Sequence, residues 1–329
     1  MRERSLTAGL ALTELGFGAA QLGNLNRETT TAHSVAAIDA AWVRGIRYFD
    51  TAPHYGLGLS ERRLGEALAG RPRGEFIVST KVGRALVPTP ERAGKQDEHG
   101  FVVPATHRRE WDFSRGGILR SLESSLDRLG LDRVDIVYLH DPDDHWDEAS
   151  TTGIDTLVEL REQGVVGAIG AGMNQTAMLT EFIRRCDVDV VMLAGRYTLL
   201  DQSALDKLIP LALERGVRVV AAGVYNSGLL SRPEVPESAH FDYLPASAEL
   251  IARARAIARI CEAHGVTLPD AAVQFALRQT AVVSVVLGTR TAEQVIEGVE
   301  RYETPIPDAL WTALVAAGHL RPEAVGASW

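Results

Sequence analysis

The chain has 329 residues, of which 46% are hydrophobic and 23% are charged, as in ordinary folded globular proteins. The net charge is −9 and the basic residues are dispersed, which argues against nucleic acid or an anionic membrane surface as the main partner. No apolar run approaches the roughly 20 residues that span a bilayer, and the first residues lack a secretory signal pattern, so we expect a cytoplasmic protein.

The chain begins with a predicted β-hairpin at Ser5 to Glu14 and then alternates between strand-like and helical patterns. The first helical patterns follow strand-like runs and end near Gly45, Gly70 and Gly130. Eight apolar runs are predicted strands: Leu15 to Ala20, Ile46 to Ala52, Phe76 to Thr80, Val134 to Leu139, Val166 to Gly170, Val188 to Ala194, Val217 to Gly223 and Val282 to Leu287.

Eight strand and helix units favour a closed parallel barrel. Strands that are hydrophobic throughout are typical of a parallel sheet covered by helices, and eight such strands close a (β/α)8 TIM barrel. The alternative is a doubly wound dinucleotide-binding sheet, but Gly56-Leu57-Gly58 and Gly170-Ala171-Gly172 both lack the third glycine at the required spacing. We therefore predict a single α/β barrel domain over residues 1–329.

Three segments are too long to be plain connections. Val82 to Asp112 follows the third strand and Val224 to Ser247 follows the seventh, so both are candidates for substrate or cofactor loops at the active face of a barrel. The tail from Leu320 to Trp329 is expected to reach the same face, and Pro307 to Gly318 predicts an extra C-terminal helix.

Titratable side chains stand at three consecutive strand ends. Asp50, Lys81 and His140 end the second, third and fourth strands, and Tyr55 lies in the loop after the second. A phenol has an ordinary pKa near 10, so it needs a neighbouring cation to carry protons at neutral pH. Lys81 would supply that cation, Asp50 would orient it, and His140 would hold the substrate oxygen. Singly, each residue also fits a structural role.

Around these residues the chain resembles the aldo-keto reductases, in the segments GIRYFDTAPHYG, FIVSTKVG and VDIVYLHDPD. The resemblance implies a catalytic tetrad of Asp50, Tyr55, Lys81 and His140, with Tyr55 as general acid or base. It also implies a nicotinamide cofactor, because no side chain can donate or accept a hydride.

A metal site is the alternative reading of His140-Asp141-Pro142-Asp143-Asp144-His145. Metal-dependent barrel hydrolases usually add a pair of histidines on the first strand, and residues 15–23 contain none. We therefore expect no metal here.

Two segments resemble the family's cofactor loops: Asn226 to Leu229 after the seventh strand, and Gly288 to Thr291 between the eighth strand and its helix. Asn174 matches the family's asparagine that binds the nicotinamide carboxamide. The expected cofactor contacts are Asn174, Asn226, Ser227, Gly228, Leu229, Gly288, Thr289, Arg290 and Gln294.

The nicotinamide pocket departs from the family pattern at Met173, Ala194 and Ala222, where many members have Ser, Gln and an aromatic residue. NADP-selective members usually carry Lys and Arg where this chain has Gly288 and Gln294, although Arg290 is a candidate partner for a phosphate. Both NAD and NADP remain open, with a slight preference for NAD.

The substrate is expected to be a small hemiacetal or aldehyde. The segments AGRYTLLDQ and NSGLL resemble the bacterial aldose 1-dehydrogenases that act on L-fucose and D-threo-aldoses, a branch that includes pyridoxal 4-dehydrogenase. Both oxidise a cyclic hemiacetal to a lactone, with Tyr55 as base here. A regulatory module that only binds nicotinamide, as potassium-channel β-subunits do, is the alternative from another class. Candidate substrate contacts are His54, Trp111, Phe113, Trp146 and Tyr225.

Overall fold

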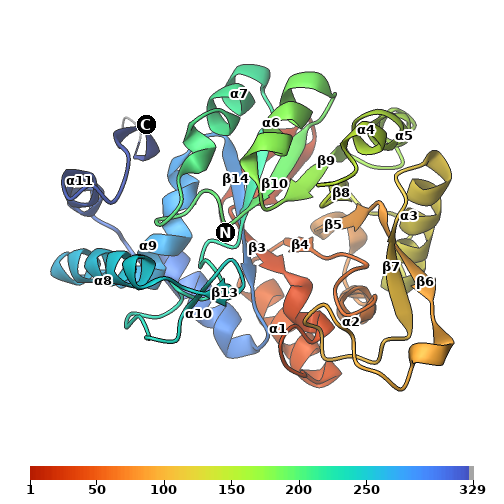
Figure 1. Ribbon diagram of the computed structural model, residues 1–329, viewed down its shortest axis with the longest axis horizontal. Helices are drawn as coiled ribbons and strands as arrows, with labels where there is room; N and C mark the ends of the chain where they lie inside the picture. Colours follow the sequence, from red (N-terminus) through yellow and green to blue (C-terminus); the bar gives the residue numbers. More distant parts are fainter. Residues whose placement is uncertain (326–329) are drawn as a thin grey trace.

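Eight parallel strands close into a barrel in a computed structural model that describes residues 1–325 (Figure 1). The strand order around the barrel is β10-β11-β14-β3-β4-β5-β8-β9, which confirms the predicted (β/α)8 fold. The tail expected at the active face ends outside the described residues. The barrel strands are β3 (Leu15–Gly18), β4 (Tyr48–Asp50), β5 (Ile77–Val82), β8 (Ile136–His140), β9 (Ala168–Met173), β10 (Val190–Ala194), β11 (Arg218–Ala222) and β14 (Val282–Gly288).

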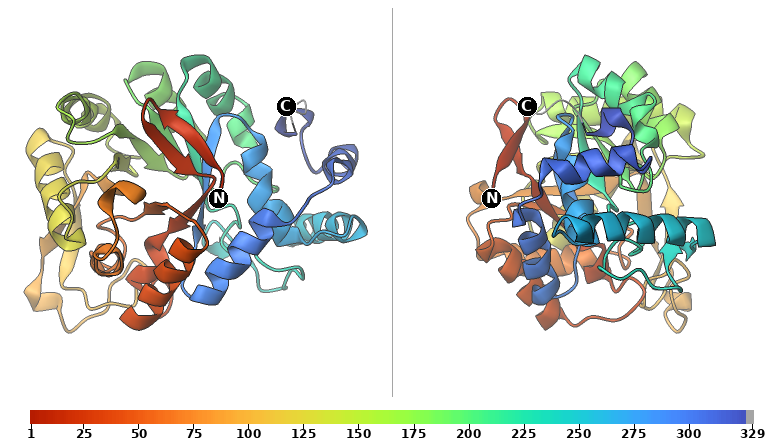
Figure 2. Two further views of the ribbon diagram at one scale, coloured as in Figure 1. Left: turned by 180° about the vertical axis from the view of Figure 1, so that it is seen from behind. Right: turned by 90° about the vertical axis from the view of Figure 1, so that its left-hand side faces the viewer.

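Helices surround the barrel on its outside (Figures 1 and 2). Ser114 caps the N-terminus of α3 through its hydroxyl, and the same helix ends at Gly130 in the left-handed conformation that glycine favours. The predicted extra helix is α11. The helices are α1 (Thr31–Val43), α2 (Leu59–Leu68), α3 (Arg115–Leu129), α4 (Trp146–Glu148), α5 (Ile154–Glu162), α6 (Thr176–Arg185), α7 (Leu208–Arg215), α8 (Ala248–Ala263), α9 (Leu268–Phe275), α10 (Ala292–Glu303) and α11 (Asp308–Ala316).

Side chains alternate between two cores along each strand, because successive residues of a strand point to opposite faces. In β4, Tyr48 belongs to the cluster inside the barrel, whereas Phe49 packs in the larger cluster between strands and helices. In β8, Tyr138 points inward and Val137 outward in the same way. Asp50, two residues after Tyr48, therefore ends its strand on the inner side.

The N-terminal hairpin closes one end of the barrel, as Figure 2 shows from behind. Strands β1 (Glu3–Thr7) and β2 (Leu10–Thr13) pair antiparallel, which confirms the predicted hairpin. Leu6 and Leu12 pack with the residues inside the barrel, and Arg4 donates to the carbonyls of Leu277 and Val282. The end of the barrel at the carboxyl ends of its strands is therefore the one left for a ligand.

Both long loops contain a further hairpin that the sequence did not reveal. After β5, strands β6 (Arg84–Pro88) and β7 (His107–Trp111) pair antiparallel and stand beside α3 (Figure 1). After β11, the two-residue strands β12 (His240–Phe241) and β13 (Leu244–Pro245) pair in the same way. Over residues 1–325, the structure contains no helix long and apolar enough to cross a membrane.

Candidate active site

A buried ion pair joins Lys81 of β5 to Asp50 of β4. Lys81 Nζ donates to both carboxylate oxygens of Asp50 at 2.9 and 2.8 Å and to the carbonyl of Thr51 at 2.9 Å. The two side chains are only 2% and 5% exposed. Burial alone would lower the pKa of Lys81, but the Asp50 carboxylate raises it above its ordinary value, so the ammonium stays charged.

Tyr55 lies against this ion pair, in the loop after β4. Lys81 Nζ is 4.9 Å from the centre of the Tyr55 ring, and the ring of His140 is 5.9 Å away and nearly perpendicular. Burial raises the pKa of Tyr55 to about 12, against the opposing charge of Lys81. Tyr55 is thus a neutral phenol at neutral pH, and Lys81 is the group that favours its anion.

His140 ends β8 and is buried beside Tyr55. Burial and the positive charge of Lys81 hold the pKa of His140 well below its usual range, so its imidazole is neutral. Its Nδ1 atom is buried and has no hydrogen-bond partner among the described residues. The structure therefore brings together all four residues of the predicted tetrad.

His54 joins the tetrad as a fifth side chain, with its ring 5.6 Å from that of His140. Arg109 of β7 donates from Nε to His54 Nδ1 at 2.5 Å, and its other nitrogens bind the carboxylate of Asp97. Burial, Arg84 and Arg109 lower the pKa of His54 to about 2. Because Nδ1 accepts a hydrogen bond, the proton of the neutral ring lies on Nε2, which makes that nitrogen a donor.

The rim of the site is formed by Arg84, Trp111 and Asp141. Arg84 donates to the Asp141 carboxylate at 3.3 Å and lies 4.7 Å from the centre of the Trp111 ring. Asp141 has a φ of 44°, a left-handed conformation that is rare outside glycine and typical of functional sites. Burial raises the pKa of Asp141 to about 6, against the charge of Arg84.

Three predicted substrate contacts are engaged within the protein: Phe113 is too buried to reach a ligand, which corrects that prediction, while Trp146 and Tyr225 stay predictions. Phe113 is fully buried in the core, in the space that Gly83 leaves by having no side chain. Trp146 packs edge-on against Phe182 of α6, and Tyr225 accepts a hydrogen bond from Arg301 of α10. Of the five predicted residues, only His54 and Trp111 stand with the tetrad.

Unpaired polar atoms mark the strand ends beside the tetrad. Asn226 Oδ1 after β11, Thr289 Oγ1 after β14 and Gln21 Oε1 after β3 are buried and lack a partner within residues 1–325. These strands are neighbours in the barrel. A Cβ on Gly288 would lie 2.5 Å from the amide nitrogen of Gln21, so the end of the Gln21 side chain lies directly against Gly288. The site can offer these polar atoms to a dinucleotide.

Gln21 was absent from the sequence prediction, because no motif surrounds it. Its one signal in the sequence is its place just after the first strand. In the structure it belongs to a short 3₁₀ helix, Ala19–Gly23, that follows β3.

Most of the other predicted cofactor contacts also pack or form hydrogen bonds within the protein. The Arg290 guanidinium donates to the carbonyls of Leu25 and Arg27, and the Gln294 side chain accepts from the Arg290 amide. Leu229 is buried in the core, while Asn174 is exposed. Ser227 accepts from the backbone of the β12–β13 hairpin, and Gly228 lies in the same turn with a φ of 94°.

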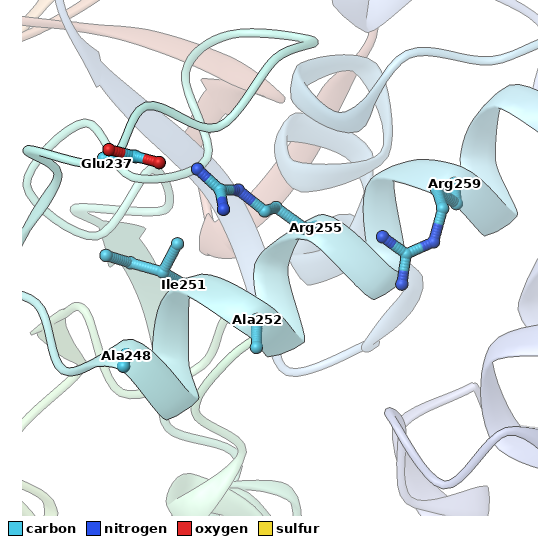
Figure 3. A pocket seen from close by; sticks show the side chains of 6 residues that line it. All are labelled: Glu237, Ala248, Ile251, Ala252, Arg255 and Arg259. Carbon is cyan, nitrogen blue, oxygen red and sulfur yellow. The ribbon is translucent and has the colours of Figure 1, made fainter.

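A shallow groove outside this site runs along α8 on the outer face of the barrel (Figure 3). It is lined by Glu237, Ala248, Ile251, Ala252, Arg255 and Arg259. In the part of the chain that the structure describes, no group of three or more His, Cys, Asp or Glu side chains is arranged to hold a metal.

Comparisons with known proteins point to one family. The model of the aldo/keto reductase family matches residues 14–318. D-threo-aldose 1-dehydrogenase of a Pseudomonas species is 47% identical, and pyridoxal 4-dehydrogenase of Microbacterium luteolum is 39% identical; each match covers 94% of this chain and 95% of the relative. The holo form of the aldo-keto reductase AKR11C1 from Bacillus halodurans superposes with a TM-score of 0.75 at 28% identity, covering 96% of both chains.

Proposed function

The chain belongs to the aldo/keto reductase family, and we propose that it oxidises the anomeric carbon of an aldose to a lactone, with Tyr55 as general base. The observation that carries the proposal is the closeness of Tyr55 to both Lys81 and His140, with Asp50 binding Lys81. The 47% identity to D-threo-aldose 1-dehydrogenase supports an aldose as substrate.

The chain's own residues handle the proton in this reaction. The Tyr55 phenolate would take the proton of the anomeric hydroxyl as the hydrogen on the same carbon leaves as hydride and the C=O bond of the lactone forms. The neutral rings of His54 and His140 would hold the reacting oxygen through N–H donors. A nicotinamide dinucleotide would supply the hydride acceptor, because no side chain can take a hydride.

The cofactor would lie across the ends of β11, β14 and β3. Asn226, Thr289 and Gln21 offer unpaired buried polar atoms within the described chain, which suit the hydroxyl and phosphate groups of a dinucleotide. We infer NAD in preference to NADP because the guanidinium of Arg290 is engaged by two backbone carbonyls. Glu293 adds an acidic side chain to the first turn of α10, which would repel a 2′-phosphate.

Pyridoxal is the second candidate substrate. The relative at 39% identity is named pyridoxal 4-dehydrogenase, and the half-exposed ring of Trp111 at the rim suits an aromatic ligand. Oxidation of the pyridoxal hemiacetal to 4-pyridoxolactone would use the same proton transfer to Tyr55.

The direct test is turnover by the purified protein. It is incubated with NAD or NADP and with L-fucose, D-arabinose or pyridoxal, and the absorbance of reduced nicotinamide is followed. We expect NAD reduction with one of the sugars and weaker or no reduction of NADP. Turnover of pyridoxal alone would favour the second candidate. Tight nicotinamide binding without turnover of any hemiacetal would reject the enzyme assignment and favour a regulatory module.

A further inference from the structure

A chain of three hydroxyl groups runs through the interior of the barrel to Asp50. Ser79 Oγ donates to Asp50 Oδ1 at 2.7 Å, Tyr48 Oη lies 3.0 Å from Ser79 Oγ, and Tyr138 Oη lies 3.4 Å from Tyr48 Oη. All three side chains are fully buried, on the adjacent strands β4, β5 and β8. Each faces inward because it lies two residues before a member of the tetrad: Asp50, Lys81 or His140.

The direction of these hydrogen bonds is fixed by the carboxylate at their end. An ionised carboxylate only accepts hydrogen bonds, so Ser79 donates its single hydroxyl proton to Asp50 and accepts a hydrogen bond from Tyr48. Tyr48, having donated its own proton, then accepts from Tyr138. Burial, together with Tyr138 and Asp50, raises the pKa of Tyr48 well above its ordinary value, and burial raises that of Tyr138. Both tyrosines are therefore neutral donors, and every hydroxyl dipole points its positive end toward Asp50.

Asp50 is held from two sides by this arrangement. Lys81 binds both carboxylate oxygens, and Ser79 binds Oδ1 from the barrel interior. The charge of Asp50 raises the pKa of Tyr55, while that of Lys81 lowers it. A donor that offsets part of the Asp50 charge and fixes its orientation therefore also sets how strongly Lys81 acts on Tyr55.

We propose that Ser79 is a positioning residue of the active site, and that Tyr48 and Tyr138 extend it into a directed chain of hydroxyl groups that holds Asp50 for Lys81. The proposal rests on the assigned role of Tyr55 in the proposed function. None of the three hydroxyl groups reaches the substrate face, so their effect should appear in kcat and in its pH dependence rather than in KM.

The kinetic test uses the graded series Ser79→Ala, Tyr48→Phe and Tyr138→Phe. In Ser79→Ala, we expect kcat to fall about three- to tenfold with KM nearly unchanged, and the rise of kcat with pH to move to higher pH, because the pKa of Tyr55 increases. The loss should be smaller in Tyr48→Phe and smallest in Tyr138→Phe, because the outermost contact is long at 3.4 Å.

Ser284→Ala is the matched control. Ser284 is a fully buried serine of the barrel strand β14 whose hydroxyl donates to the Thr13 carbonyl at 2.8 Å, so its loss costs a comparable hydrogen bond without touching Asp50. It should leave the pH profile where it is. If Ser79→Ala behaves like Ser284→Ala, with the rise of kcat at the same pH as in the wild type, the proposal is overturned.

A second measurement needs no turnover. The chain has three lysines, of which Lys81 is buried while Lys95 and Lys207 are exposed. In protein labelled with ¹⁵N-lysine, the ammonium of Lys81 should give a slowly exchanging NMR signal that shifts or broadens in Ser79→Ala and stays in place in Ser284→Ala. That result, obtained with a protein that oxidises no hemiacetal, would support the positioning role while rejecting the proposed function. An unchanged Lys81 signal in Ser79→Ala would overturn the positioning role itself.

Discussion

Replacing Lys81 by methionine separates the structural and catalytic roles of the ion pair. The pair is almost fully buried, and Lys81 supplies two of the hydrogen bonds to Asp50. Removing the ammonium leaves Asp50 as an uncompensated buried charge, which costs about 3–5 kcal/mol of unfolding free energy. Ser79 still donates to the carboxylate, so we expect the lower part of this range.

The double variant Lys81→Met with Asp50→Asn removes both charges and keeps the size of the Asp50 side chain. It should recover most of the lost stability, to within about 1–2 kcal/mol of the wild type. Turnover should not recover, because Tyr55 has lost the cation that lowers its pKa. We expect kcat to remain about 10²- to 10⁴-fold below that of the wild type. Urea denaturation and steady-state kinetics measure the two effects. A Lys81→Met protein as stable as the wild type, or a double variant with normal kcat, would refute this account.

Three further predictions follow from the charges of the site. Oxidation should accelerate by up to about tenfold per pH unit below the Tyr55 pKa of about 12, since the phenolate is the base, and a flat profile would contradict this. Acid should destabilise the fold. The pKa values of His54 and His140 are lowered in the folded protein, so below pH 6.5 protons bind preferentially to the unfolded chain. The free energy of unfolding should then fall by about 1.4 kcal/mol per pH unit for each ring. Asp141 should offset part of that loss, because burial raises the pKa of its carboxyl to about 6 in the folded protein, which therefore takes up this proton before the unfolded chain does. Urea midpoints at several pH values, with His54→Asn for comparison, measure how the stability changes with pH. Finally, Arg109→Gln removes the hydrogen bond to His54 Nδ1 that fixes the orientation of the His54 ring, so KM should rise severalfold. An unchanged KM would argue that His54 does not contact the substrate.

The fold and the grouping of Asp50, Tyr55, Lys81 and His140 could be predicted from the sequence because both depend on short local segments, while the catalytic roles came from a family resemblance. Most of the barrel strands are short, largely apolar runs, and polar residues stand near their carboxyl ends. Asp50 and His140 are the last residues of β4 and β8, and Lys81 is the residue before the last of β5. The parallel pairing of neighbouring strands then brings them to one mouth of the barrel.

The surroundings of the tetrad depend on pairing between distant segments, which no local pattern encodes. Arg109 in the run of charges HRRE looks like a surface residue, and only the β6–β7 hairpin carries it to His54, 55 positions away in sequence. Phe113 follows a loop as a substrate contact would, but the space left by Gly83 draws its ring into the core. In the sequence, Arg290 resembles a phosphate ligand. In the structure, its guanidinium donates to two carbonyls of the β3–α1 loop instead.

The central claim is that the phenol of Tyr55 carries the proton, and the Tyr55→Phe variant tests it most directly. The substitution removes one oxygen and keeps the ring that packs against His54 and Phe101. We predict that kcat falls by about a hundredfold or more, while titration with reduced nicotinamide shows unchanged cofactor affinity. Near-normal turnover by Tyr55→Phe would contradict the account.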